Sequence, residues 1–165
     1  MMTFEFELRC PITADLGLMR DLVRIHGHHS GLPRGRLEDL VLAVNEAVTN
    51  VFDHGGGSGT LTARTAVGRI VVEILDVAGR LTRDHLASAR VDPAGSHGYG
   101  LWVIQHLCDE VALEQTGHGS LLTLGVRHHP AVPHRPDQRP DHRPDQRPDQ
   151  RVRSDHHPAQ PVGVP

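Results

Sequence analysis

The stretch that decides the fold, LEDLVLAVNEAVTNVFDH, spans residues 37–54. At about 100° of rotation per residue, it predicts an amphipathic helix whose apolar residues converge on one stripe. That stripe consists of Leu37, Leu40, Val41, Val44, Ala47, Val48 and Val51. Asp39, Glu46, Asn50 and Asp53 fall on the opposite side, so we expect the helix to bury one face and to keep the other polar.

Two polar residues of this helix, Glu46 and Asn50, are one turn apart and project as neighbours from the same face. A carboxylate beside a carboxamide offers oxygen acceptors and one amide donor. This pair suits a hard cation such as magnesium, or a water or hydroxyl group that must lose a proton. The alternative is a solvated helix surface, on which polar residues at this spacing are common.

The flanking patterns predict a mixture of strands and helices. Alternating and β-branched residues indicate strands at 3–8, 60–66 and 70–75, and a closing hairpin of 110–115 with 120–127. Thr13 is the expected N-cap of a helix that Gly27 closes, and residues 27–35 are expected to form a loop that includes two of three nearby histidines. Residues 81–96 resemble a lid, with one short helical piece at 84–89.

Two places outside the central helix could contact a ligand. Asp76 ends the strand at 70–75, where an aspartate either forms a turn or accepts a hydrogen bond from a bound ligand. The run GSHGYG at 95–100 leads directly into a predicted helix at 101–108. Small residues at a helix start place backbone amides and the positive end of the helix dipole where a phosphate can bind. Trp102 on that helix is expected to pack into the core, the alternative being an interface with a partner.

Composition divides the chain at about residue 130. Residues 130–165 hold nine of the twelve prolines and repeat Arg-Pro-Asp every four residues, so we expect a disordered tail after one folded domain of residues 1–129. The folded part carries eleven arginines against fifteen acidic residues, which argues against direct nucleic-acid binding. The chain has no lysine, which excludes a P-loop or Schiff-base mechanism. We expect reduced thiols at Cys10 and Cys108, no membrane span, and a cytoplasmic location.

With these residues in order, the chain resembles the ATP-binding domain that gyrase, heat-shock chaperones, histidine kinases and mismatch-repair ATPases share, the GHKL superfamily with the Bergerat fold. Within it, the chain is most similar to the small anti-sigma-factor serine kinases of bacteria. The resemblance covers residues 8–127, and its most specific motif is NEAVTN at 45–50. It implies an α+β fold, a two-layer α/β sandwich whose mixed, mostly antiparallel sheet is covered on one face by helices.

The resemblance also implies roles for single residues. Asn50 would hold Mg²⁺ and Glu46 would be the general base, while Asp76 would accept from the adenine amino group of ATP. The remaining nucleotide-binding positions implied are Ala78, Gly98, Tyr99, Gly100, Leu101 and Ser120, the last fixing adenine through water. At Ala78 and Arg80 the family usually has glycine, and we expect these two departures to lower nucleotide affinity.

The function implied is that of an anti-sigma factor with serine/threonine kinase activity. Such a protein binds a sigma factor and phosphorylates an anti-sigma-factor antagonist, and it could act as a homodimer. A histidine kinase is not expected, because no coiled-coil repeat precedes residue 37. The alternative is a non-catalytic ATP-binding module that sequesters a partner protein. Such a module has no need of the carboxylate of Glu46, so the sequence favours the kinase.

Overall fold

The computed structural model describes residues 6–54, 56–90 and 98–129, all of which lie in the unit Met1–Val132. The elements in chain order are β1 (Phe6–Pro11), α1 (Leu16–His29), α2 (Arg34–His54), β2 (Gly59–Ala66), β3 (Arg69–Asp76), α3 (Arg83–Ala87), α4 (Tyr99–Leu107), β4 (Glu110–Thr116) and β5 (Gly119–Arg127). The five strands form one sheet in the order β1-β2-β3-β5-β4. Every described strand pair is antiparallel.

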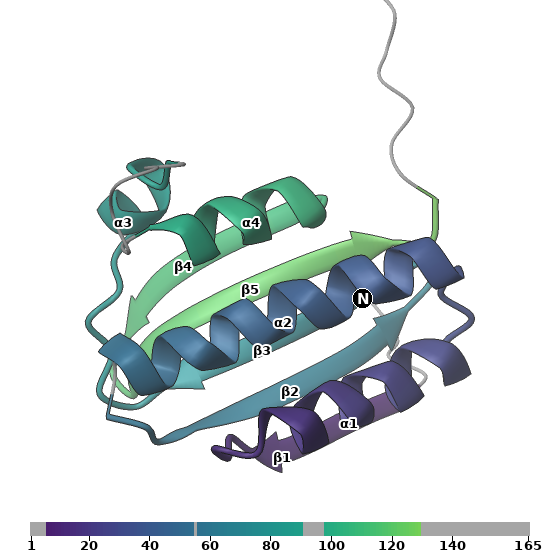
Figure 1. The fold of residues 1–165 in the computed structure, drawn as a ribbon, viewed down its shortest axis with the longest axis horizontal. Helices are drawn as coiled ribbons and strands as arrows, with labels where there is room; N and C mark the ends of the chain where they lie inside the picture. Colours follow the sequence, from purple (N-terminus) through teal and green to yellow (C-terminus); the bar gives the residue numbers. More distant parts are fainter. Residues whose placement is uncertain (1–5, 55, 91–97, 130–165) are drawn as a thin grey trace, which may run out of the picture. The chain divides into compact units, whose positions relative to one another are not determined.

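One face of the sheet carries the helices, which confirms the predicted two-layer α+β sandwich. Figure 1 shows α1, α2 and α4 lying across the same face, with α2 over the middle of the sheet. Burial alternates along β3, where Ile70, Val72, Ile74 and Asp76 are buried and the residues between them are only half-buried. This period of two is what a strand with one covered face requires.

The central helix α2 is confirmed, with its start three residues earlier than predicted. All seven predicted apolar residues are buried, and Ala43 joins them. The face that they form packs on β3 and β5 and contacts α1 and α4 on either side. Because α2 is fixed along its length, the residues on its polar side project at defined positions between the other helices.

The prediction for α1 was wrong at both ends. Its N-cap is Asp15, whose Oδ1 accepts a hydrogen bond from the Leu18 N–H at 2.9 Å, and not Thr13. The helix continues through Gly27 to His29, so the histidines expected in or near a loop form its last turn. Gly27 is a packing position, since a Cβ there would lie 2.5 Å from Leu37 Cδ1.

The N-terminal strand β1 continues to Pro11, three residues beyond the predicted end at Leu8, whereas residues 1–5, which include the predicted start, lie outside the described residues. The Phe6 ring stacks on the ring of His26 at 5.2 Å. His26 is buried and lies 3.2 Å from Thr65 Oγ1 through its Nε2. Burial, helped by the charge of His29, lowers the pKa of His26, so the neutral ring is the form that this packing favours.

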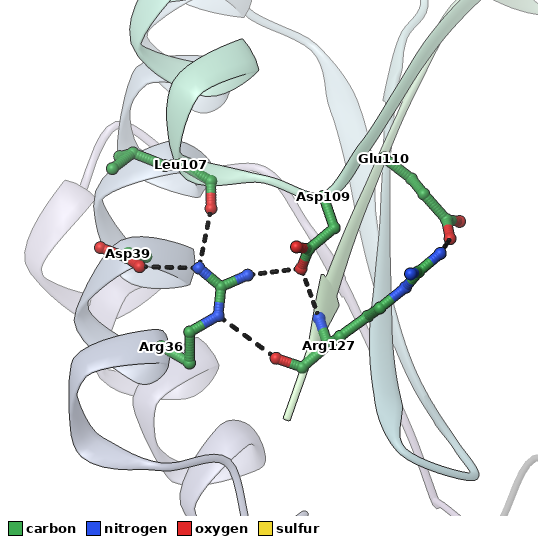
Figure 2. A network of polar contacts seen from close by, with 6 residues as sticks. All are labelled: Arg36, Asp39, Leu107, Asp109, Glu110 and Arg127. Atoms are coloured by element: carbon green, nitrogen blue, oxygen red, sulfur yellow. Dashed lines mark hydrogen bonds and ion pairs between the residues drawn. The ribbon is translucent and has the colours of Figure 1, made fainter. Parts of the chain in front are cut away.

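Arg36 in the first turn of α2 joins three elements (Figure 2). Its guanidinium donates to Asp39 Oδ2 at 2.9 Å, to the Leu107 carbonyl at the end of α4, to Asp109, and to the Arg127 carbonyl at the end of β5. Asp109 in turn accepts from the Arg127 N–H at 2.8 Å. The arginine side chain is only 16% exposed. Burial raises the pKa of the neighbouring Cys108 thiol to about 12, so this cysteine stays protonated.

We expect Arg36→Ala to lower the free energy of unfolding by about 2–3 kcal/mol, because it removes the cation that pairs with Asp109 and the donor to the Leu107 and Arg127 carbonyls. Arg36→Lys should recover less than half of that loss, since an ammonium group cannot reproduce the planar fork of donors. Urea unfolding followed by circular dichroism measures both. Arg24→Ala is the control, because its ion pairs with Asp21 and Glu38 are exposed. An Arg36→Ala loss no larger than that of Arg24→Ala would contradict a structural role for the network.

Candidate functional site

The polar side of α2 meets the start of α4 at Glu46 and Asn50. Gly100 in the first turn of α4 faces both residues: a Cβ on it would lie 3.1 Å from Glu46 Oε2 and 3.4 Å from Asn50 Oδ1. A glycine is therefore the residue that allows α4 to approach these two side chains. The structure thus brings Gly100 to Glu46 and Asn50, which precede it by about fifty residues in the sequence.

Gly98 caps the N-terminus of α4 in a left-handed conformation, with φ of 90°. Its carbonyl accepts from the Trp102 N–H at 3.1 Å and closes the first turn. Leu101 anchors this turn in the core, whereas Tyr99 is exposed and stacks on Trp102. Trp102 is half-buried between Tyr99 and His106 and is absent from the buried core cluster, so the expectation that it packs into the core was wrong.

A pocket of about 500 Å³ opens between the end of α2, the start of α4 and the α3 region. Its lining residues are Asn50, Asp53, His54, Arg80, Leu81, His85, Ser88, Ala89, Gly98 and Leu101. Three of the predicted site residues, Asn50, Gly98 and Leu101, therefore share one cavity. Residues 91–97, which include the first part of the predicted glycine-rich run, lie outside the described residues.

The predicted residues on the strands form a second group at the end of the sheet. Asp76 is 4% exposed and pairs with Ser120 across β3 and β5. Its Oδ1 accepts from the Ala78 N–H at 3.1 Å, and the Gly79 N–H donates to its carbonyl. Asp76 therefore does form the turn that the sequence allowed. None of Asp76, Ala78 and Ser120 lines the 500 Å³ pocket.

Ser120 connects this corner to the segment that leads into α3. Its hydroxyl donates to the Leu81 carbonyl at 2.9 Å and accepts from Gln115 Nε2 at 2.8 Å. Gln115 also donates to the Leu81 carbonyl. Sequence reasoning missed Gln115, although it faces Ser120 directly across the closing hairpin. The role of Ser120 toward adenine stays a prediction. In the structure its hydroxyl donates its hydrogen bond to the Leu81 carbonyl.

Ala78 and Arg80, the two departures from the family pattern, lie in different places. Ala78 is exposed and lies beside Gly56. A Cβ added to Gly56 would lie 3.0 Å from the Cβ of Ala78. Arg80 lines the same pocket as Asn50. The segment between them is tight, since Gly79 packs directly on the backbone of Ser120. Leu81 follows in the pocket wall and so joins the strand-end group to the pocket.

The donor set fits a magnesium nucleotide. Asn50 Nδ2 is buried without a hydrogen-bond partner, and such a group is normally satisfied by a ligand or water. Within residues 6–54, 56–90 and 98–129, no cluster of three or more His, Cys, Asp or Glu side chains could hold a metal by itself. Magnesium commonly takes one or two protein oxygens and completes its shell with phosphate oxygens and water. Asn50, with Glu46 beside it, would be the protein's contribution to such a shell.

Fold and site together define an α+β domain in which a polar helix faces a helix N-terminus. The family model of the histidine kinase-like ATPase domain matches residues 12–126, and the chain belongs to this family. Family membership implies that the chain binds ATP. A comparison with curated proteins returned no match. No helix among the described residues has the length and apolarity needed to cross a membrane.

Solved structures share the fold. One is the structure of the RsbU and RsbW domains of Rv1364c from Mycobacterium tuberculosis, with 21% identity and a TM-score of 0.56 over 74% of this chain and 32% of that one. The other is the SiaB–SiaC complex from Pseudomonas aeruginosa, with 17% identity and a TM-score of 0.56 over 74% of this chain and 88% of that one. The chain thus spans about a third of the length of the mycobacterial chain that it matches.

Proposed function

We propose that the chain is an anti-sigma regulatory factor that uses ATP to phosphorylate a serine or threonine of an antagonist protein. The observation that carries the proposal is the meeting of Glu46 and Asn50 with Gly100 at the start of α4. A general base and a metal-binding amide at the N-terminus of a helix are the parts that phosphoryl transfer requires. The resemblance to anti-sigma-factor kinases supports the choice of a protein substrate.

In this proposal the chain's residues mainly position ATP and the acceptor hydroxyl and offset the negative charge of the phosphates. Asn50 would hold magnesium, and the ion would offset the negative charge of the phosphates. The amides at the start of α4 face the phosphates, and Asp76 recognises adenine. Glu46 takes the proton of the acceptor hydroxyl as its oxygen bonds to the γ-phosphorus. The bond from that phosphorus to the bridging oxygen breaks, and ADP leaves.

Protein partners are part of the same proposal. One structural neighbour was solved as a complex of two proteins, which supports a protein partner for this chain as well. A sigma factor and its antagonist are the partners that we infer, with a homodimer as a further possibility and the cytoplasm as the place of action.

The test is transfer of phosphate from ATP to a candidate antagonist protein of the same organism, with the full chain and magnesium present. We expect one phosphoserine or phosphothreonine on the antagonist, located by mass spectrometry. An antagonist that binds the chain in the presence of ATP but gains no phosphate would contradict the kinase. It would favour the alternative, a module in which ATP only stabilises the partner-binding conformation.

A further inference from the structure

Arg80 is an exposed cation that lines the pocket, and no residue that the structure describes pairs with it. It forms no ion pair or hydrogen bond with any residue that the structure describes, although it lines the same cavity as Asn50 and Asp53. Arg36 shows the contrast, since its guanidinium is fully engaged by Asp39, Asp109 and two carbonyls. An arginine that lines a cavity and pairs with none of the described acidic side chains is available to an anionic ligand.

A second side chain that lines the pocket, His85, offers a hydrogen-bond donor. His85 Nδ1 is 3.0 Å from the Thr82 N–H and 2.9 Å from the Thr82 hydroxyl. A backbone N–H can only donate, so Nδ1 is the acceptor and the neutral ring carries its proton on Nε2. The capping contact therefore fixes the ring and leaves Nε2–H as the donor that a ligand in the pocket can use.

The helices α2 and α4 supply few charges to the pocket. Asp53 and His54 come from the end of α2. Gly98 and Leu101, at the start of α4, are uncharged. Because the chain has no lysine, arginine is the cationic side chain that can offset the charge of a polyphosphate here, and a neutral histidine can add a hydrogen-bond donor. Arg80, in the segment before α3, and His85, on α3, line the same cavity as Asn50.

We propose that Arg80 and His85 form a phosphate-binding wall, which makes the pocket select a nucleoside polyphosphate over the uncharged nucleoside. The inference rests on the proposed nucleotide-binding function and deepens it. It reverses the expectation from sequence that Arg80 weakens nucleotide binding. The guanidinium supplies the charge-assisted hydrogen bonds, and the imidazole of His85 adds a neutral donor of fixed orientation.

The test compares ATP with adenosine by calorimetry, on the full chain with magnesium. Arg80→Gln keeps much of the side-chain length and removes the charge, and we expect ATP affinity to fall at least about ten-fold while adenosine affinity changes less than two-fold. His85→Glu keeps an acceptor suited to the capping box but adds a negative charge, and should lower ATP affinity by a similar factor. Arg9→Gln is the matched control, since Arg9 is exposed on the helix-free face of the sheet.

The outcomes separate this inference from the proposed function. Wild-type protein that binds ATP with an affinity unchanged by Arg80→Gln overturns the phosphate-binding wall and leaves the proposed function standing. Equal losses of ATP and adenosine in both variants also overturn it, because they indicate a structural role. Wild-type protein that binds neither ligand overturns the proposed function and the inference together.

Discussion

Glu46→Gln should abolish phosphate transfer and leave ATP binding nearly intact. Glutamine keeps the size and polarity of the side chain that faces Gly100, but it cannot accept a proton from a hydroxyl group. Loss of a general base lowers the rate by about 10²–10⁴-fold. We expect the single-turnover transfer rate to fall within this range, while the dissociation constant for ATP changes less than about three-fold, which is below 1 kcal/mol.

Glu38→Gln is the control for this experiment. Glu38 lies two turns earlier on α2, and its carboxylate pairs with Arg24 at the surface. Its substitution should change neither transfer nor binding. Loss of ATP binding in Glu46→Gln would show that the carboxylate holds the nucleotide and is not the general base.

Gly79→Ala should disrupt the strand-end part of the site. A methyl group at this position would overlap the backbone nitrogen of Ser120 and lie 2.8 Å from its hydroxyl oxygen. Relief requires β3 and β5 to separate at the Asp76–Ser120 pair, or the segment to Leu81 to move away. We expect a loss of at least about 2 kcal/mol in the free energy of unfolding, as for other overpacked positions.

Urea unfolding measures this loss, and Gly117→Ala provides the comparison. Gly117 lies in the turn between β4 and β5, where an added Cβ would have no neighbour within 4 Å. Its substitution should cost less than about 0.5 kcal/mol, as surface changes usually do. If Gly79→Ala lowers the free energy of unfolding no more than Gly117→Ala does, the ends of β3 and β5 at Asp76 and Ser120 do not depend on this close packing.

The parts of the fold that follow from local periodicity could be predicted from sequence. The buried face of α2 could be predicted from the spacing of its apolar residues alone. The same helical spacing correctly placed Glu46 and Asn50 on one face. The hairpin of β4 and β5 followed from two β-prone runs around a glycine-rich turn. Asp76 was correctly placed at a strand end for the same reason.

The parts that depend on contacts between distant segments could not be predicted. Gly27 reads as a helix stop, but it is kept inside α1 because Leu37 of α2 packs against it. Trp102 has an apolar helix around it, yet the core below α4 is filled by Leu101 and Ile104. The place of Arg80 in the same pocket as Asn50 depends on how β3, β5 and α3 come together.

The central claim is that Asn50 joins a magnesium nucleotide to α2 beside the start of α4. The most direct measurement is calorimetric ATP binding, with and without magnesium, on the wild type and on Asn50→Ala. We predict that magnesium strengthens ATP binding to the wild type at least about ten-fold, and that the variant loses this dependence because its metal-binding oxygen is gone. An equal gain from magnesium in both proteins, or no ATP binding by the wild type, would contradict the account.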